Sequence, residues 1–179
     1  MIDRIVRTLL FTLAVAVAPA FAQEAATEDP LAMFEPLVGR TWKGEGTEGE
    51  VAGKTDIITW ERIMGGKGVQ STHSIGDGEY GGVTLFFYDP AQKTVLFHYF
   101  TTANFHSTGT VEKADNGDIV AVEHIHGLEN LPEVRGRIVF NDRGWETRAS
   151  YLKDGRWVEG DGFRYVEAPA EKVVFREVR

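Results

Sequence analysis

Apolar and polar positions alternate along most of the chain after residue 39, in runs rich in Thr, Val, Ile, Phe, Tyr and Trp. Turn-forming residues such as Asp89-Pro90, Asp115-Asn116-Gly117 and Asp154-Gly155 separate these runs. The pattern predicts about ten short strands joined by tight turns, so that successive strands are antiparallel neighbours. The predicted strands are 40–50, 54–64, 67–76, 81–89, 93–102, 104–113, 118–127, 133–141, 144–153 and 156–166, with 172–178 as a possible terminal addition.

The absence of crossover helices between these runs leaves a β-sandwich or an up-and-down barrel. Gly109, Gly136, Gly160 and Gly162 lie inside predicted strands, where a strand must bend or bulge. A closed sheet also removes exposed edges. We therefore expect an all-β, antiparallel up-and-down barrel over residues 39–179.

A helical pattern precedes the barrel. Asp29 can cap a helix whose first turn carries Pro30. Its apolar side would consist of Leu31, Phe34, Leu37 and Val38. The segment 23–38 is thus predicted to be a lead-in with one short helix.

The first 22 residues have the features of an export signal. Arg4 and Arg7 precede an uncharged apolar stretch at 8–22 that ends in Ala20-Phe21-Ala22. This stretch is shorter than the roughly 20 residues that a membrane-spanning helix needs. The sequence therefore predicts a signal peptide at 1–22, a periplasmic or secreted product, and no membrane span after cleavage.

The charge balance narrows the possible partners. Lys and Arg number 19 against 27 Asp and Glu, which gives a net charge of −8 and argues against nucleic-acid binding. The chain has no cysteine, so disulfides, thiolate nucleophiles, Cys-ligated metals and Cys-ligated haem are all excluded.

Two segments resemble a known fold family. The run LVGRTWKGEG at 37–46 resembles the opening of calycin-like barrels, although lipocalins separate the Gly and the Trp by one residue and here two lie between Gly39 and Trp42. The run VTLFFYDPAQKTV at 83–95 resembles a hairpin of an uncharacterised lipocalin-like group of secreted bacterial proteins, known only as a domain of unknown function. The resemblance implies a hollow barrel in which Gly39 and Trp42 help to close one end, and it brings no catalytic residue.

The strand Ile119–Gly127 offers two alternative faces to a barrel interior. One face carries Val122, His124 and His126, whereas the other carries Glu123 among apolar residues. Burial of an unpaired carboxylate is unfavourable, so we expect the histidine face to point inward. The opposite orientation stays open if Arg137 or Arg148 pairs with Glu123.

The histidines raise two cofactor alternatives. His124 and His126 could hold a metal with His98 or His106, and some ten-stranded barrels of similar layout, the nitrobindins, bind haem through one histidine. No histidine here lies in a recognisable ligand motif. We therefore expect no metal or cofactor, with haem or a His-bound metal as the alternative.

Arginines and aromatic residues complete the candidate site. Arg135, Arg137, Arg148 and Arg164 are expected mainly on the outer surface, with Arg148 kept as the candidate that could hold a ligand carboxylate. Tyr99 is one of many strand aromatics expected to line a cavity. The predicted ligand-binding residues are His98, Tyr99, Val122, His124, His126 and Arg148.

These features favour a binding protein that sequesters a small, mostly apolar molecule. The chain lacks the nucleophile elbow, phosphate loop and zinc-protease motifs, so no catalytic residue is assigned. A haem- or metal-dependent, isomerase-like enzyme and an accessory interaction protein with a filled barrel are the alternatives.

Overall fold

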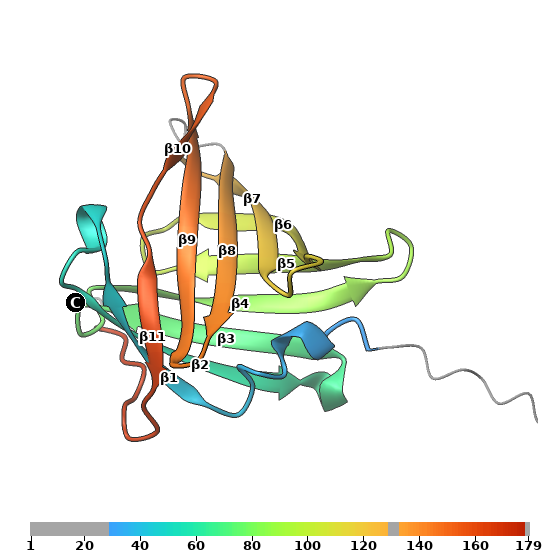
Figure 1. The fold of residues 1–179 in the computed structure, drawn as a ribbon, viewed down its shortest axis with the longest axis horizontal. Coiled ribbons are helices and arrows are strands. Elements are labelled where there is room, and N and C mark those ends of the chain that lie inside the picture. The colour runs from blue at the N-terminus through green and yellow to red at the C-terminus, as the bar shows by residue number, and fades with distance from the viewer. Residues whose placement is uncertain (1–28, 129–132, 178–179) are drawn as a thin grey trace, which may run out of the picture.

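A computed structural model describes residues 29–128 and 133–177, and it shows a closed antiparallel barrel (Figure 1). The strands are β1 (Thr41–Gly46), β2 (Thr55–Ile63), β3 (Gly68–Ile75), β4 (Tyr80–Asp89), β5 (Thr94–Thr101), β6 (His106–Lys113), β7 (Ile119–His126), β8 (Glu133–Asn141), β9 (Gly144–Lys153), β10 (Arg156–Glu159) and β11 (Phe163–Glu167). Each of β1 to β8 pairs with its successor, and β9–β11 and β11–β1 pairings close the sheet. The all-β prediction is therefore confirmed.

The last two strands occupy one position in the barrel wall, because β10 and β11 both pair with β9. Between them, the Gly160 N–H donates to the carbonyl of Ala149, and the Ala149 N–H donates to the carbonyl of Asp161. A Cβ at Gly160 would lie 1.8 Å from the ring of Tyr151, so glycine is needed here. The predicted strand 156–166 is thus interrupted by a bend, and the barrel has ten strand positions.

The possible strand at 172–178 does not form within the described residues, which end at 177. The tail instead runs over the outer side of β3, where the Val174 N–H donates to Ser74 Oγ at 3.1 Å. The Arg176 guanidinium donates to the carbonyls of Gly76 and Asp77. Because β11 already pairs with β1, the closed sheet offers the tail no edge.

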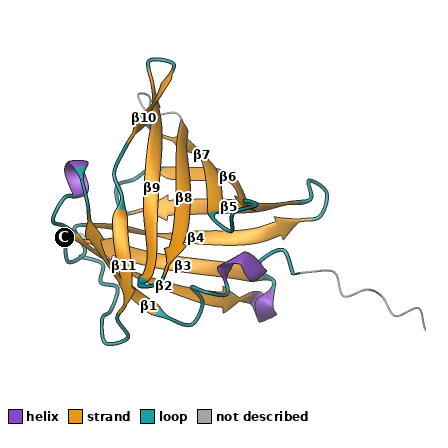
Figure 2. Ribbon diagram, viewed as in Figure 1, coloured by secondary structure: helices purple, strands orange, loops and turns teal. Residues whose placement is uncertain are grey.

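The described part of the lead-in, residues 29–38, contains one 3-10 turn, η1 (Ala32–Phe34), which is shorter than the predicted helix (Figure 2). Asp29 Oδ1 accepts a hydrogen bond from the N–H of Leu31. Further 3-10 turns are η2 (Gly49–Val51) and η3 (Met64–Gly66). Leu31, Phe34 and Leu37 are buried, as the sequence predicted, and Phe34 lies against Trp60 and Phe86 inside the barrel. Burial of these side chains, rather than helix length, fixes the lead-in.

Trp42 lies at the barrel end that the lead-in covers. Its indole N–H donates to the carbonyl of Leu37, and the Arg40 guanidinium lies 5.8 Å above its ring. Gly39 has a φ of +75°, which lets the chain turn from the lead-in into β1, and its N–H donates to the carbonyl of Trp60. These contacts hold the lead-in against the wall.

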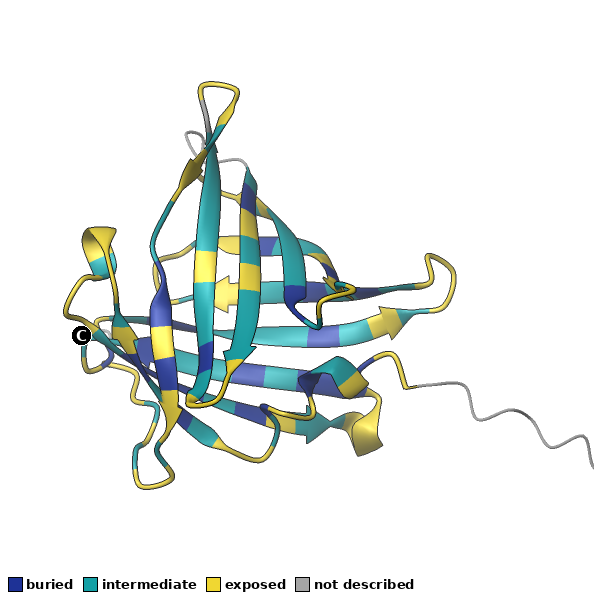
Figure 3. Cartoon of the chain, viewed as in Figure 1, coloured by how far each residue is buried: buried dark blue, intermediate teal, exposed yellow. Residues whose placement is uncertain are grey.

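Buried and exposed positions alternate along the strands, as Figure 3 shows. The inward residues form one core that runs from the lead-in to Phe163 and Tyr165. Within residues 29–128 and 133–177, no helix has the length and apolar character needed to cross a bilayer. The predicted signal peptide at 1–22 lies outside the described residues.

Candidate functional site

A cavity of about 300 Å³ lies inside the barrel, and its wall extends to Ile75 at the end of β3 away from the lead-in. A second cavity of about 130 Å³ adjoins it nearer the lead-in and shares Trp60 and Phe86 with it. Aromatic rings supply much of the larger cavity's wall: Trp60, Phe86, Phe97, Tyr99, Trp145, Phe163 and Tyr165. The polar part of the wall consists of Asp56, Ser71, His73, Thr84, Glu123 and Thr147.

Asp56 on β2 is the centre of a hydrogen-bonded network in this wall. The residue is 2% exposed, and Tyr165 donates to its Oδ2 at 2.6 Å. His73 Nδ1 lies 3.1 Å from its Oδ1. A carboxylate can only accept, so the Nδ1 atom of His73 carries the proton. Both oxygens of Asp56 are therefore satisfied by protein groups.

The network continues through two tyrosines. Tyr99 Oη lies 2.7 Å from His73 Nε2 and 2.8 Å from Tyr80 Oη. When His73 is neutral its Nε2 is an acceptor, so Tyr99 donates to His73 and accepts from Tyr80. Burial raises the pKa of Tyr99, and its interaction with Tyr80 raises it further. Burial also raises the pKa of Tyr165, and the neighbouring Asp56 adds to this rise. Both phenols therefore remain protonated donors at neutral pH.

Glu123 on β7 is the second carboxyl group in the cavity wall. The described residues give it one hydrogen bond, donated by Ser107 Oγ on β6. Burial raises the pKa of Glu123, and the hydrogen bond from Ser107 acts in the opposite direction without cancelling the rise. Glu123 is thus a carboxyl group that faces the cavity with few protein partners.

The orientation predicted for β7 is wrong, because Glu123 faces inward and the histidines face outward. Ile119 is 3% exposed and Ala121 lines both cavities, whereas the side chain of His124 is 57% exposed. No arginine rescues Glu123 in the described structure. A raised pKa and the Ser107 hydroxyl reduce the penalty of burying it, and the inward face gains the apolar surface of Ile119 and Ala121.

Three of the outward histidines, His98, His106 and His126, belong to a row of rings across β4 to β7. His98 stacks between Phe87 and Phe100, and Phe100 in turn stacks on His106. His106 and His126 lie face to face with ring centroids 4.8 Å apart. His98, His124 and His126, together with Val122 on the same outer face of β7, therefore lie away from the cavity.

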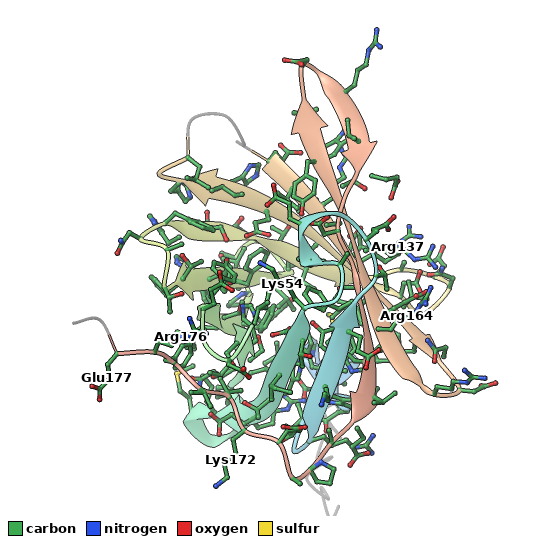
Figure 4. The ribbon with its side chains drawn as sticks, turned by 90° about the vertical axis from the view of Figure 1, so that its left-hand side faces the viewer. Lys54, Arg137, Arg164, Lys172, Arg176 and Glu177 are labelled. Atoms are coloured by element: carbon green, nitrogen blue, oxygen red, sulfur yellow. The ribbon has the colours of Figure 1, made fainter. Side chains whose placement is uncertain are left out.

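Of the predicted ligand-binding residues, Tyr99 alone has its side chain in the larger cavity's wall. Arg148 contributes to the wall of the smaller cavity, but its side chain is 62% exposed and its Nη2 lies 2.7 Å from Glu146 Oε1. Arg137 and Arg164 also lie on the outer side, as Figure 4 shows. Arg135 stacks outside on Trp157, so the expectation of outer arginines is confirmed.

Asp56 and His73 were missed as site residues. A sequence signal was available, because both lie in predicted neighbouring strands that an antiparallel hairpin joins. In that hairpin Asp56 pairs with Ile75 and Ile58 with His73, which makes Asp56 and His73 diagonal neighbours on the inner face. The hairpin could be predicted, but the contact also depends on which residues of β2 and β3 lie opposite each other. The sequence does not give this register directly.

The cavity residues do not fit a haem group. His73 is the histidine in the cavity wall, and both of its ring nitrogens are engaged, one by Asp56 and the other by Tyr99. An axial ligand needs a nitrogen lone pair directed at the iron. Among the described residues, no group of three His, Asp or Glu side chains is arranged to hold a metal ion.

No protein-family model matches this chain, and a search of curated proteins found no significant match.

Proposed function

We propose that this protein sequesters a small, mostly apolar molecule inside its barrel. The observation that carries the proposal is the aromatic-lined cavity of about 300 Å³. Ligand sites are typically concave and mainly apolar, with a few polar groups that fix orientation. Glu123, with one hydrogen bond from the described residues, would be such a group here.

The cavity volume limits the ligand size. A protein cavity of about 150 Å³ can hold benzene, so about 300 Å³ suits a molecule on the order of two rings. The adjoining smaller cavity would extend this space toward Phe34. The proposed ligand is therefore a compact bicyclic or branched molecule rather than a long chain.

The resemblance to calycin-like barrels supports the same proposal. The closed barrel, the lead-in over one end and the burial of Trp42 agree with that layout. We further propose that residues 1–22 direct export to the periplasm or outside the cell and are removed there. Amino-terminal sequencing of the exported protein should begin at Gln23, and a chain that retains Met1 would contradict this.

Isothermal titration calorimetry with 2-naphthol, a neutral bicyclic probe, tests the cavity. Native protein should bind one equivalent. Ala121→Trp fills the space that both cavities share and should abolish binding. Val122→Trp is the matched control, because it places the same ring on the outer face of the same strand.

Thermal unfolding of both variants verifies that they fold. Binding by the wild type and by Val122→Trp, with loss in folded Ala121→Trp, supports the proposal. If native protein takes up no probe, or if Ala121→Trp binds as well as the wild type, the cavity does not hold the ligand and the barrel is better described as filled.

A further inference from the structure

Glu123 is the cavity group whose hydrogen-bonding capacity the protein leaves most incomplete. A carboxylate has about four acceptor positions, and the described residues supply one donor, Ser107 Oγ. The other carboxylate of the wall, Asp56, accepts hydrogen bonds from Tyr165 and His73. A ligand that donates a hydrogen bond or carries a positive charge would complete Glu123.

The described cavity wall contains no lysine or arginine that could neutralise Glu123. The arginines nearest in sequence, Arg135 and Arg137, belong to β8 and point outward, where Arg135 stacks on Trp157 and Arg137 approaches Asp118. His73 cannot serve, because its two nitrogens are engaged by Asp56 and Tyr99. Arg137 and Arg148 contribute to the wall of the smaller cavity, but their side chains are more than half exposed and lie near Asp118 and Glu146. A bound cation is therefore the partner that this wall leaves for Glu123.

The rest of the wall is suited to a cation. Ring faces attract a desolvated ammonium group through their quadrupoles, and the cavity wall includes Trp60, Trp145, Phe97 and Tyr99. The indole N–H groups of Trp60 and Trp145 lack partners but are sealed by protein atoms, so they do not present donors to an anionic ligand.

Two loops at the barrel end opposite the lead-in, β1–β2 and β3–β4, carry more acidic than basic side chains. The acidic residues are Glu48, Glu50, Asp77 and Glu79. The basic residues beside them are Lys54, which Figure 4 labels, and Arg176 of the tail, which donates to the carbonyls of Gly76 and Asp77. An excess of negative charge raises the local concentration of cations, so these loops favour the same class of ligand as the cavity.

We propose, on the basis of the proposed binding function, that the ligand is a protonated amine on an aromatic or bicyclic body, with its ammonium group paired to Glu123. The apolar body would occupy the ring-lined space, and the ammonium would donate to the carboxylate beside Ser107. A ligand carboxylate, which the sequence had suggested through Arg148, is disfavoured by this arrangement.

Three probes of one shape separate the possibilities: tryptamine, its neutral alcohol tryptophol, and indole-3-acetate. Calorimetry on the exported protein at neutral pH should give an affinity for tryptamine at least tenfold above that for tryptophol, with indole-3-acetate weakest. Glu123→Gln should reduce tryptamine affinity at least tenfold and change tryptophol affinity less than twofold. Glu112→Gln, which removes an exposed charge on β6, is the matched control and should change neither.

The outcomes distinguish this inference from the function beneath it. Equal affinity for tryptamine and tryptophol, or a tryptamine preference that survives in Glu123→Gln, overturns the amine assignment but leaves cavity binding intact. Tightest binding of indole-3-acetate overturns it as well. If none of the probes binds native protein, the binding function itself fails. If Glu123→Gln does not fold, the order of affinities of the three probes for the wild type still tests the amine assignment.

Discussion

Two carboxyl groups in one cavity, Asp56 and Glu123, have opposite surroundings. Asp56 lies in the β2–β5 half of the wall and accepts from Tyr165 and His73, whereas Glu123 lies on β7 and accepts from Ser107. The first is part of a continuous network that fixes side chains from five strands. The second has unused acceptor positions that face open space.

This difference separates structural from functional polarity. A buried polar group that protein partners satisfy fully adds rigidity and specificity to the core. A partly buried polar group with few partners, such as Glu123, lowers stability unless a ligand completes it, and such groups gather at binding sites. We therefore assign Asp56 to the support of the barrel and Glu123 to the bound molecule.

The largest expected effect comes from Asp56→Asn. The substitution replaces one acceptor oxygen of Asp56 by an NH2 group, which donates hydrogen bonds. This NH2 group then faces another donor, either the hydroxyl of Tyr165 or the Nδ1–H of His73, so one hydrogen bond is lost. We expect the free energy of unfolding to fall by about 3 kcal/mol. Urea titration followed by tryptophan fluorescence measures this, and an unchanged midpoint would show that the network does not support the fold.

Tyr99→Phe should have a smaller effect on stability. It removes the hydroxyl between His73 and Tyr80 and leaves both without that partner. The expected loss is about 1–3 kcal/mol in the same titration. Tyr88→Phe, at an exposed position of β4, is the control and should stay within about 0.5 kcal/mol of the wild type. Equal effects of the two substitutions would remove Tyr99 from the network.

Glu123→Gln should act in the opposite direction, and its effect should depend on pH. Burial raises the pKa of Glu123 in the folded state, so the folded protein favours the neutral acid. The full stability is therefore present below the unfolded-state pKa of Glu123. It is lost as the pH rises through the folded-state pKa and the side chain ionises. The variant should match the wild type at low pH and be more stable above that window by about 1–3 kcal/mol. Thermal unfolding across pH 4 to 9 measures the difference. A constant difference at all pH values would mean that Glu123 is not desolvated.

The smallest effect is expected for His124→Ala. Its side chain lies outside the barrel, 3.7 Å from Glu133. Affinity for 2-naphthol should change less than twofold, and stability by less than about 0.5 kcal/mol. The calorimetric titration described above is sufficient, with Ala121→Trp as the positive control. A large loss of affinity would restore the outer face of β7 as a candidate site.

The strand positions could be predicted because their causes are local. Side-chain alternation and the turn residues Asp89-Pro90 and Asp154-Gly155 act within a few residues of each strand end. The burial of Leu31, Phe34 and Leu37 also followed from their apolar pattern. The helix length was overestimated, since contact with Trp60 and Phe86 needs only one turn.

The site could be predicted only in part. Tyr99 was expected in the cavity wall and lies there, but His98, His124, His126 and Val122 do not. The prediction for β7 treated Glu123 as unpaired unless an arginine reached it. The serine that does reach it belongs to the neighbouring strand β6, where Ser107 is paired with Ile125 in the register.

The sequence by itself determined an all-β chain with the approximate positions of most strands, an acidic charge and the exclusion of cysteine chemistry, because each depends on local pattern or composition. The tertiary structure decided which face of β7 points inward, the assembly of Asp56, His73 and Tyr99 from three strands, and the outer path of the tail. These features depend on register and barrel closure, which join residues far apart in the chain, and a one-residue change of register would exchange every inward side chain for an outward one.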